Sequence, residues 1–512
     1  MTNRAEALLA RADETPASPA LIIGDTIITY RMLAARVRTA AGGLEALGVA
    51  QGDHVGIWLP STPDFIVIQQ ALFLLGAVVT PINVLYRPGE ITHAVQCCAL
   101  TRVITSAELA ATVDKQPPCP LIVIDTAIES EDTRSLSCAI ADSGSFNSMA
   151  RVKDEDLALL LLTSATTGKA KGVMLTASNL TANYDRTPAW LGLDRHSVIL
   201  CALPLYNTFG LNQGINAMLA TGCRMVLLPR FDAEQCIKAI AHHGCTFLPA
   251  VPTMLQKIID HPAANRAALR SLRTVMTGGA PVPSALLRRL LKLAPDVEVL
   301  TGYGLTEGTA LVTLTQVHLG QDGMIERERT IGRALDGMEI TILDEDGAVQ
   351  PTGECGEIAV RGPNVMAGYF EAPEDTAQAI RNGWLMTGDI GYFDADGYGY
   401  IVDRKKDVII RGGQNIYPAD IEDVLYQVPG VAEAAVVARE DTLLGEVPVA
   451  FVALKAGSAA SIEDMLGLCR VSLAPYKCPV AIEILAELPK GPTGKILRRA
   501  LRAQPNAEQA SR

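Results

Sequence analysis

The sequence predicts an α/β protein whose long N-terminal region consists of mostly parallel sheets flanked by helices. Over residues 21–300, short apolar runs alternate with stretches rich in Ala and Leu, a pattern typical of buried parallel strands between helices. Over residues 332–403 the residues alternate around two Asp-Gly pairs, in "DEDGAV" and "DADGYG", which are strong hairpin signals. The remaining chain alternates strands and helices. We therefore expect an antiparallel β subdomain after the parallel sheets and a small α+β domain at the end.

The expected elements of the first region can be placed in order along the chain. The first residues, "MTNRAEALLARADETP", have the pattern of an amphipathic helix and lack the apolar stretch of a signal peptide. The expected strands are "VGIWLP", "RVITS", "PLIVID", "RMVLLP", "CTFLPAVP", "LRTVMTGG" and "VEVLTGYG". The change of pattern at "DRKKD" predicts an N-terminal domain of residues 1–403, β-rich over 332–403, and a C-terminal domain of residues 404–512.

Composition and charge exclude several classes of protein. The 512 residues include 44 basic and 56 acidic side chains, for a net charge of −12, whereas proteins that bind nucleic acids or anionic membranes present a basic face. No run approaches the ~20 apolar residues of a membrane span. The 11 cysteines include an adjacent pair, Cys97 and Cys98, but no C-x-x-C, so we expect free thiols rather than disulfides or zinc. These features predict a cytoplasmic protein with no nucleic-acid partner and no transmembrane segment.

A loop rich in small hydroxyl residues follows an apolar run. In "LLLTSATTGKAKGVMLT", residues 160–176, the leucines predict a strand and residues 163–172 a loop. Hydroxyl groups, backbone N–H groups and two lysines would cradle phosphate oxygens, but a surface turn explains the same residues. The loop is not a Walker A motif, because Gly168 and Lys169 are followed by Ala170.

The stretch "TGYGLTEG", residues 301–308, follows the apolar run "VEVL". It should therefore stand at the carboxyl end of a strand, where α/β sheets bind ligands. Tyr303 can stack on a base, Thr306 can donate to a phosphate, and Glu307 can hold Mg²⁺. The alternative is a capped helix start, in which Thr306 and Glu307 satisfy backbone donors.

Two later stretches contribute a carboxylate and a lysine. Residues 384–422 include Asp389, whose carboxylate can bridge two ribose hydroxyls. In "LPKGPTGKILRRALR", residues 488–502, Lys495 stands on a Gly-rich turn before a basic helix. A solvated helix start would explain Lys495 alone.

In this order, the four stretches resemble those of the adenylate-forming superfamily, which comprises acyl-CoA synthetases, peptide-synthetase adenylation domains and luciferases. The resemblance covers nearly the whole chain, and "YIVDRKKDVIIRGGQNIYPADIE" is most similar to bacterial fatty-acyl and aryl-CoA synthetases. It implies a two-step reaction. A carboxylate attacks the α-phosphorus of ATP and releases pyrophosphate, and a thiol, usually that of CoA, then displaces AMP from the acyl-adenylate. ATP, Mg²⁺ and CoA are the implied cofactors.

The resemblance also implies roles for the nucleotide-binding residues. The β- and γ-phosphates would be cradled by Thr163, Ser164, Thr166, Thr167, Gly168 and Lys171. The adenine would be lined by Gly279, Ala280, Pro281, Tyr303 and Gly304. Thr306 would contact the α-phosphate, and Glu307 and Thr163 would hold Mg²⁺. Asp389 and Arg404 would bind the ribose.

Residues of the C-terminal domain would serve both half-reactions. Lys495 would reach the bridging oxygen between carboxylate and α-phosphate, where a preorganised cation is worth about 10²–10³ in rate. Lys406 matches the family's hinge position, about which this mobile domain rotates between the two steps. After the rotation, residues 411–413 (Arg411, Gly412 and Gly413) would line a tunnel for the pantetheine arm, because glycine lets it pass close to the backbone.

The sequence departs from the family pattern in two places. Ala165 and Ala170 stand where the phosphate loop normally has Gly and Pro. An Ala at positive φ costs about 1 kcal/mol and at negative φ little. We expect the loop still to function, because its hydroxyl residues and Lys171 are intact. Asn207 stands where His is common, and Asn cannot take up a proton. Either thiol transfer is weakened or directed to another acceptor, or Asn207 reshapes the acyl pocket, which is the hypothesis we favour.

The implied acyl pocket is mostly apolar and uncharged. Its residues would be Tyr206, Asn207, Phe209, Gly210, Leu211, Val251, Met254, Gly278, Gly308, Thr309 and Ala310. Without an Asp or Lys to pair with an ammonium or a second carboxylate, this pocket favours a hydrophobic monocarboxylic acid over an amino acid.

The leading hypothesis is therefore an acyl-CoA synthetase, acting as a monomer or a homodimer. The alternative is an adenylating enzyme that loads a carrier-protein phosphopantetheine or leaves thiol transfer to a partner. A non-catalytic nucleotide-binding protein is disfavoured, because a mere binder needs no cation such as Lys495 for a transition state.

Overall fold

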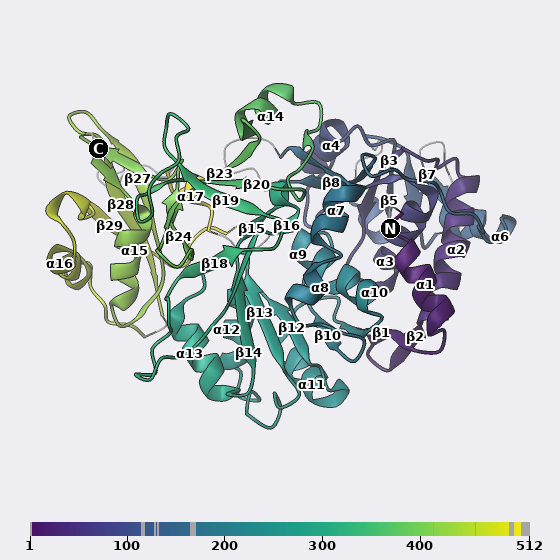
Figure 1. Ribbon diagram of the computed structural model, residues 1–512, viewed down its shortest axis with the longest axis horizontal. Coiled ribbons are helices and arrows are strands. Elements are labelled where there is room, and N and C mark those ends of the chain that lie inside the picture. The colour runs from purple at the N-terminus through teal and green to yellow at the C-terminus, as the bar shows by residue number, and fades with distance from the viewer. Residues whose placement is uncertain are drawn as a thin grey trace. The chain divides into compact units, whose positions relative to one another are not determined.

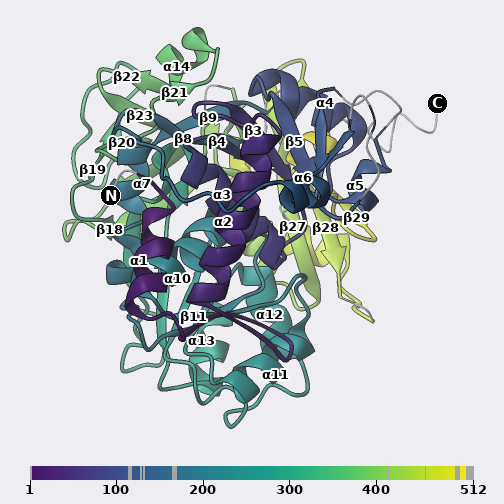
Figure 2. The same cartoon turned by 90° about the vertical axis from the view of Figure 1, so that its right-hand side faces the viewer.

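The computed structural model describes residues 3–113, 118–126, 130, 133–163, 170–412, 414–455, 457–490 and 496–502 (Figures 1 and 2). The chain divides into two compact units. Unit 1 comprises Met1–Ile340 and Val360–Met386, and unit 2 comprises Thr341–Ala359 and Thr387–Arg512. The domain boundary after residue 403 and the hinge at Lys406 stay predictions.

The first large sheet of unit 1 is mostly parallel. Its strands are β3 (His54–Trp58), β4 (Val78–Pro81), β5 (Arg102–Thr105), β6 (Leu121–Val123), β7 (Thr133–Ser135), β8 (Leu157–Leu162), β9 (Gly172–Thr176) and β21 (Gly368–Tyr369). They follow the order β21-β9-β8-β4-β3-β5-β6-β7. The pairs from β8 to β7 are parallel, whereas β9 is antiparallel to both β8 and β21.

The second large sheet of unit 1 has a parallel centre and antiparallel edges. Its strands are β1 (Pro19–Ile23), β2 (Thr26–Thr29), β10 (Val198–Cys201), β11 (Arg224–Leu227), β12 (Phe247–Ala250), β13 (Thr274–Gly278), β14 (Glu298–Gly302), β17 (Thr313–Gln316) and β18 (Thr330–Ala334). Within unit 1 they follow the order β18-β17-β14-β13-β12-β10-β11-β1-β2. The pairs from β14 to β1 are parallel. The edge pairs β14–β17, β17–β18 and β1–β2 are antiparallel. All seven predicted runs form strands, so the α/β prediction is confirmed.

Helices pack against both sheets (Figure 1). They are α1 (Glu6–Glu14), α2 (Tyr30–Ala46), α3 (Pro63–Leu75), α4 (Pro88–Cys97), α5 (Ala107–Ala110), α6 (Leu136–Asp142), α7 (Ala177–Asn183), α8 (Thr187–Trp190), α9 (Thr208–Gly210), α10 (Ala217–Thr221), α11 (Ala233–His243), α12 (Pro252–Asp260) and α13 (Ser284–Leu293). The predicted N-terminal helix is α1. Figures 1 and 2 show α2 beside α3. Every α3 residue from Phe65 to Leu75 is buried, as expected for a helix that is apolar on all sides.

The predicted antiparallel region contains β19 (Glu339–Leu343), β20 (Gly356–Arg361), β22 (Ile380–Arg381), β23 (Trp384–Phe393) and β24 (Gly399–Arg404). Strands β22, β23 and β24 pair antiparallel in that order. Gly347 and Gly397 have φ of +83° and +78°, which confirms turns at both Asp-Gly pairs because such φ values favour glycine. The alternation did not predict helix α14 (Pro373–Ala379), which belongs to unit 1.

The C-terminal part of unit 2 is the predicted small α+β fold. Its elements are β25 (Ile409–Arg411), β26 (Gln414–Ile416), α15 (Pro418–Gln427), β27 (Val431–Asp441), β28 (Gly445–Leu454), α16 (Ile462–Ser472), β29 (Ala481–Leu485) and α17 (Arg498–Arg502). The sheet order is β26-β25-β28-β27, with β29 paired to β28. Leu425 of α15 and Met465 of α16 pack in one apolar core with Val452 of β28.

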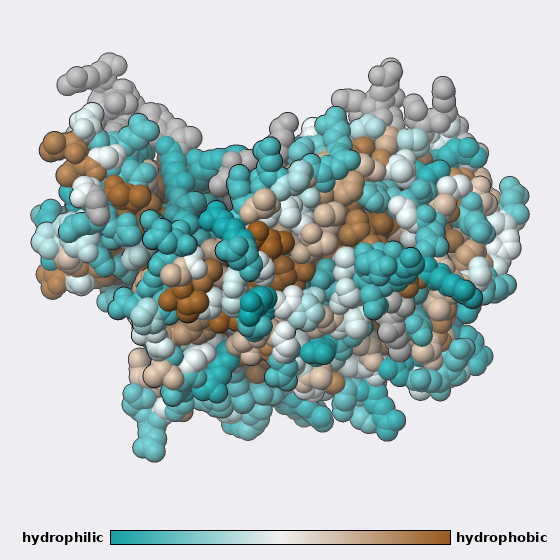
Figure 3. Space-filling view, turned by 45° about the horizontal axis from the view of Figure 1, so that its top comes forward, coloured by the Kyte–Doolittle hydropathy of each residue, from teal (hydrophilic) through white to brown (hydrophobic). Residues whose placement is uncertain are grey.

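The surface is mixed in character. On the face drawn in Figure 3, hydrophobic residues stand in separate groups among hydrophilic ones. Among the described residues, no helix combines the length and the apolar character that crossing a bilayer requires.

Candidate active site

The stem of the hydroxyl-rich loop is a hairpin between β8 and β9. Leu162 pairs with Gly172. Just beyond this pair, the backbone N–H of Thr163 donates to the carbonyl of Lys171 at 3.0 Å, and the N–H of Lys171 donates to Thr163 Oγ1 at 3.1 Å. The structure thus places Thr163 and Lys171 side by side at the loop's base. Four predicted phosphate-binding residues lie outside the described residues, namely Ser164, Thr166, Thr167 and Gly168. Ala165 also lies outside them.

Lys171 and Glu307, predicted from separate stretches, meet at one tyrosine. The Tyr369 hydroxyl donates to Glu307 Oε1 at 2.9 Å, and Lys171 Nζ lies 5.0 Å from the centroid of the Tyr369 ring. Lys171 Nζ also pairs with Asp375 Oδ1 of α14 at 2.5 Å. We call Lys171, Glu307, Tyr369 and Asp375 the tyrosine cluster; all of its members belong to unit 1.

Backbone contacts fix the position of Glu307. Residues Thr306–Gly308 form a short 3₁₀ turn rather than the start of a helix. The carbonyl of Glu307 accepts from the N–H of Met366 at 2.8 Å, and Asn364 Nδ2 donates to the carbonyl of Gly308 at 3.0 Å. The N-cap residue, Leu305, makes no side-chain cap, and the Glu307 carboxylate accepts from Tyr369, so the capped-helix alternative does not describe Glu307.

The predicted adenine segments lie at the same edge of the second sheet. Strands β13 and β14 are parallel, with Gly278 paired to Gly302, so Gly279 and Tyr303 follow the carboxyl ends of neighbouring strands, where such sheets bind ligands. Gly279 has φ +78°, while Ala280 and Pro281 are exposed. Tyr303 is buried, and its carbonyl accepts from the N–H of Val312 at 2.9 Å.

Several predicted acyl-pocket residues are connected by described contacts. The Thr208 hydroxyl bonds to the Tyr184 hydroxyl at 2.7 Å and donates to the carbonyl of Thr309 at 3.4 Å, which joins the segment at Asn207 to the one after Glu307. A Cβ built on Gly279 would lie 3.9 Å from Val251 Cγ1. Met254 is buried on α12.

An irregular helix follows Asn207. Residues Leu211–Asn216 form a π-helix between α9 and α10, and such turns are frequent at functional sites. Asn207 precedes α9 and makes no side-chain cap there. Sequence analysis missed the buried amides on the π-helix, Asn212 and Gln213. Asn212 Nδ2 donates to Thr187 Oγ1 at 2.9 Å.

In unit 2, Asp389 and Arg404 are paired opposite each other on β23 and β24. Arg404 Nε lies 2.8 Å from Asp389 Oδ1. A residue that sequence analysis missed supports this pair: buried Glu357 accepts from the N–H of Gly388 at 3.0 Å and from Lys405 Nζ at 2.9 Å. Glu357 therefore holds the neighbours of both predicted ribose residues. We call Glu357, Asp389, Arg404 and Lys405 the carboxylate cluster.

The hinge and tunnel residues lie in the C-terminal part of unit 2. The carbonyl of Lys406 accepts from Arg502 Nη2 of α17 at 3.2 Å. Arg411 Nη1 donates to the carbonyl of Tyr476 at 2.6 Å, and Gly412 has φ +56°. Gly413 and Lys495 lie outside the described residues, so their roles stay predictions.

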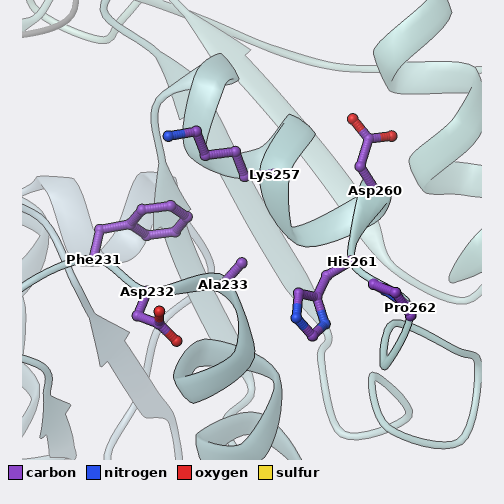
Figure 4. Close-up of a pocket in the computed structure, with 7 residues that line it drawn as sticks. All are labelled: Phe231, Asp232, Ala233, Lys257, Asp260, His261 and Pro262. Carbon is purple, nitrogen blue, oxygen red and sulfur yellow. The ribbon is translucent and has the colours of Figure 1, made fainter.

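A hollow of about 450 Å³ lies elsewhere in unit 1, where α12 ends and α11 begins. Figure 4 shows Phe231 and Asp232 on one side and Lys257 and His261 on the other. Its lining residues, Phe231, Asp232, Ala233, Lys257, Asp260, His261 and Pro262, include none of the predicted site residues.

Comparison with known proteins identifies the family. The family described as "AMP-binding enzyme" matches residues 8–370, and the "AMP-binding enzyme C-terminal domain" matches residues 420–495. The chain therefore belongs to the AMP-binding enzyme family.

Similar proteins are CoA ligases. A feruloyl-CoA synthase from Amycolatopsis sp. is 35% identical, covering 96% of this chain and 97% of that protein. A long-chain-fatty-acid–CoA ligase from Bacillus subtilis is 32% identical, covering 93% and 89%. The structure of o-succinylbenzoate CoA synthetase from B. subtilis with its acyl-adenylate intermediate aligns with a TM-score of 0.85 at 30% identity, covering 99% of both chains; that enzyme has also been solved with ATP and a magnesium ion. The protein is thus an adenylate-forming acyl-CoA synthetase that uses ATP, Mg²⁺ and CoA.

The described residues fit a metal ion that binds together with the nucleotide. Mg²⁺ is usually held by one or two carboxylates plus substrate phosphates. Glu307 supplies a half-buried carboxylate beside Tyr369. Within the described part of the chain, no three His, Cys, Asp or Glu side chains gather as a metal site of their own. A single carboxylate such as that of Glu307 fits Mg²⁺ that arrives bound to ATP.

Proposed function

We propose that the protein activates a hydrophobic monocarboxylic acid as acyl-AMP and transfers the acyl group to CoA. The observation that carries the proposal is the tyrosine cluster, in which a phosphate-loop lysine and a metal-binding carboxylate from distant stretches meet at Tyr369. A cation and a carboxylate beside a hydroxyl-rich hairpin suit the binding of a nucleotide triphosphate with Mg²⁺.

In the first step, the nucleotide is held and polarised by residues on several elements. Thr163, Ser164, Thr166, Thr167, Gly168 and Lys171 hold the β- and γ-phosphates. Gly279, Ala280, Pro281, Tyr303 and Gly304 line the adenine, and Asp389 and Arg404 bind the ribose. Thr306 contacts the α-phosphate, while Glu307 and Thr163 hold Mg²⁺. When bound, Mg²⁺ neutralises phosphate charge.

Charge develops on the bridging oxygen as the carboxylate attacks. Lys495 donates to that oxygen and stabilises the transition state. In the second step, the domain turns at Lys406, and Arg411, Gly412 and Gly413 admit the pantetheine arm. These roles follow from the family's motifs at matching positions.

The acyl group lies in the pocket at Asn207. An uncharged lining favours apolar acids, and the similar proteins are named for ferulate, long-chain fatty acids and o-succinylbenzoate. We propose that Asn207 shapes this pocket and that CoA is the acceptor. A carrier protein as acceptor, and a monomer or homodimer as assembly, remain hypotheses of the sequence alone. We place the enzyme in the cytoplasm, where ATP and CoA are available together.

The test is pyrophosphate release across a panel of fatty, phenylpropenoic and polycyclic acids, with and without CoA. We expect release with at least one hydrophobic acid, and stoichiometric acyl-CoA when CoA is present. Pyrophosphate release without formation of acyl-CoA would favour the alternative in which a carrier protein accepts the acyl group. Release with no acid of the panel, but with amino acids, would overturn the proposal.

A further inference from the structure

Two adjacent thiols meet at the end of helix α4. Cys97 Sγ and Cys98 Sγ are 3.8 Å apart. Neighbouring residues of a regular helix do not face each other, but Cys98 lies beyond the last helical residue, with φ −111° and ψ 4°, and its sulfur approaches that of Cys97. Cys97 is half-buried and accessible, whereas Cys98 is fully buried.

The buried thiol packs against the stem of the phosphate loop. A Cβ placed on Gly172, the first residue of β9, would lie 3.1 Å from Cys98 Sγ, so that sulfur rests on the strand where a side chain would otherwise stand. Cys98 also shares an apolar cluster with Leu160 of β8. Helix α4 therefore supports both strands of the hairpin.

A second contact joins α4 to the same loop. His93, one turn before Cys97, bonds through Nε2 to the carbonyl of Ala170 at 2.7 Å. Lys171 stands between the two residues that α4 contacts, Ala170 and Gly172, and bonds back to Thr163. The end of α4 is thus in contact with the residues that flank Lys171.

We propose that Cys97 and Cys98 form a dithiol site that binds trivalent arsenic compounds, and that its occupation displaces the phosphate-loop stem. Two thiols at this separation can both bond to one thiophilic atom. The binding claim stands on this geometry alone, and its consequence for adenylate formation rests on the proposed function.

The chemistry begins at Cys97. The hydrogen bond between the two thiols lowers the pKa of Cys97, while this same hydrogen bond and burial raise the pKa of Cys98. Since the thiolate is the reactive form, Cys97 attacks first. With phenylarsine oxide, two As–S bonds form, the arsenic–oxygen bond breaks, and the oxygen leaves as water with both thiol protons. No oxidation state changes.

The adduct should alter the loop because an arsenic atom bonded to Cys98 Sγ needs room beside Gly172, where an added Cβ would already lie 3.1 Å from that sulfur. A misplacement of about 1 Å at a binding group can cost about 10²-fold in rate. We therefore expect ATP–pyrophosphate exchange to fall by about 10–100-fold when the site is occupied.

The experiment treats the full-length protein with one equivalent of phenylarsine oxide. Intact mass should increase by one phenylarsenic group, and peptide mapping should place it on Cys97 and Cys98. Exchange activity should return with 2,3-dimercaptopropanol, a dithiol, but not with an equal thiol concentration of 2-mercaptoethanol.

Variants locate the site. Cys97→Ser should keep basal activity and lose the adduct, because chelation needs both sulfurs. Cys98→Ser should do the same if it folds. Cys97→Ser alone is sufficient to test the proposal. Cys355→Ser, which removes an exposed thiol, should behave as the wild type. An adduct that persists in Cys97→Ser, or that maps to Cys469 and Cys478, would overturn the proposal. A correctly mapped adduct on a protein without exchange activity would instead count against the proposed function.

Discussion

The tyrosine cluster of unit 1 and the carboxylate cluster of unit 2 hold predicted nucleotide-binding residues in contrasting ways. In the first, the side chains of Lys171 and Asp375 are each 40% exposed, and Glu307 is bound by a neutral hydroxyl. In the second, the side chains of Asp389 and Glu357 are only 4% and 9% exposed, and each pairs with a cation. Exposed ion pairs contribute about 0–1 kcal/mol, whereas breaking a buried one costs several kcal/mol.

The two clusters therefore suit different tasks. The contacts of the tyrosine cluster can be exchanged for those of a phosphate or a metal at little cost. The carboxylate cluster is the more rigid scaffold, since its two carboxylates are buried and need their partners, while the cations Arg404 and Lys405 are 39% and 49% exposed. The expected effects of substitution differ accordingly.

The largest effect is expected from a residue in neither cluster. Lys495→Ala should lower adenylate formation by about 10²–10³-fold, because the charge on the bridging oxygen loses its cation, while separately made acyl-AMP is still converted to the thioester. Pyrophosphate release and single-turnover thioester formation measure the two steps. The matched control is Lys490→Ala, which removes a lysine of the same sequence stretch that pairs with Glu433. It should leave pyrophosphate release unchanged. Unchanged pyrophosphate release in Lys495→Ala would contradict the mechanism.

The carboxylate cluster should respond strongly to Glu357→Ala. The half-buried N–H of Gly388 and the ammonium of Lys405, whose side chain is 49% exposed, lose their acceptor, so we expect a loss near the lower end of the about 1–3 kcal/mol for an unsatisfied buried donor. Urea denaturation should register this loss, together with a higher KM for ATP if Asp389 shifts. Glu357→Gln keeps one acceptor for Gly388 and should recover part of both. Equal stability of wild type and Glu357→Ala would show that the scaffold is not fixed in this way.

The tyrosine cluster should respond to Tyr369→Phe mainly in function. One hydrogen bond is worth about 0.5–1.5 kcal/mol net, so stability should change little, but kcat/KM for Mg·ATP should fall as much as about tenfold because Glu307 loses its orienting partner. Tyr400→Phe removes a similar hydroxyl contact, to Asp394 at 3.1 Å, and should leave kcat/KM unaltered. Equal kcat/KM values for Tyr369→Phe and Tyr400→Phe would contradict a functional role for the tyrosine cluster.

Alkaline pH provides an independent test of the same hydroxyl. Burial and the Glu307 carboxylate raise the pKa of Tyr369 above its ordinary value of 10.0. A raised folded-state pKa stabilises the protein fully below the unfolded value, and this contribution is lost as the pH rises past 10 towards the folded-state pKa. The free energy of unfolding should therefore fall more steeply above pH 10 in the wild type than in Tyr369→Phe. Parallel urea-denaturation profiles from pH 9 to 11 would contradict this.

The smallest effect is expected from Asp375→Asn. It removes the exposed partner of Lys171, and such pairs contribute about 0–1 kcal/mol. Stability should hardly change, and the KM for ATP should fall slightly because Lys171 no longer exchanges a carboxylate for phosphate. Raising the salt concentration should remove the difference. A loss of more than about 2 kcal/mol would mean that this pair is structural.

The sequence was sufficient for most of the fold because its signals are local. Apolar runs such as "VEVL" became strands, and the Asp-Gly pairs became turns at Gly347 and Gly397. Helix α14 was missed because its short segment, "PEDTAQA", buries no residue and so has no apolar period that predicts a helix.

The candidate site residues were proposed from motifs that each stand in one continuous stretch, as for Asp389 with Arg404 or Glu307 after β14. The partners of these residues could not be predicted in this way. Tyr369 is 62 residues from Glu307, and Glu357 is 48 residues from Lys405. Tyr369, which follows Gly368, belongs to no periodic pattern that would indicate its contact. For Glu357, the sequence shows only an acidic residue inside the otherwise apolar strand "GEIAV".

Local properties of the sequence are enough for the α/β class, for the positions of the strands along the chain and for the motifs of the proposed nucleotide site, since hydrophobic period, turn chemistry and motif spacing are properties of neighbouring residues. Which distant side chains share a hydrogen bond or an ion pair depends on the tertiary structure. Those contacts depend on how strands such as β9 and β21 come to lie side by side, and on burial, which sets whether a charge needs a permanent partner.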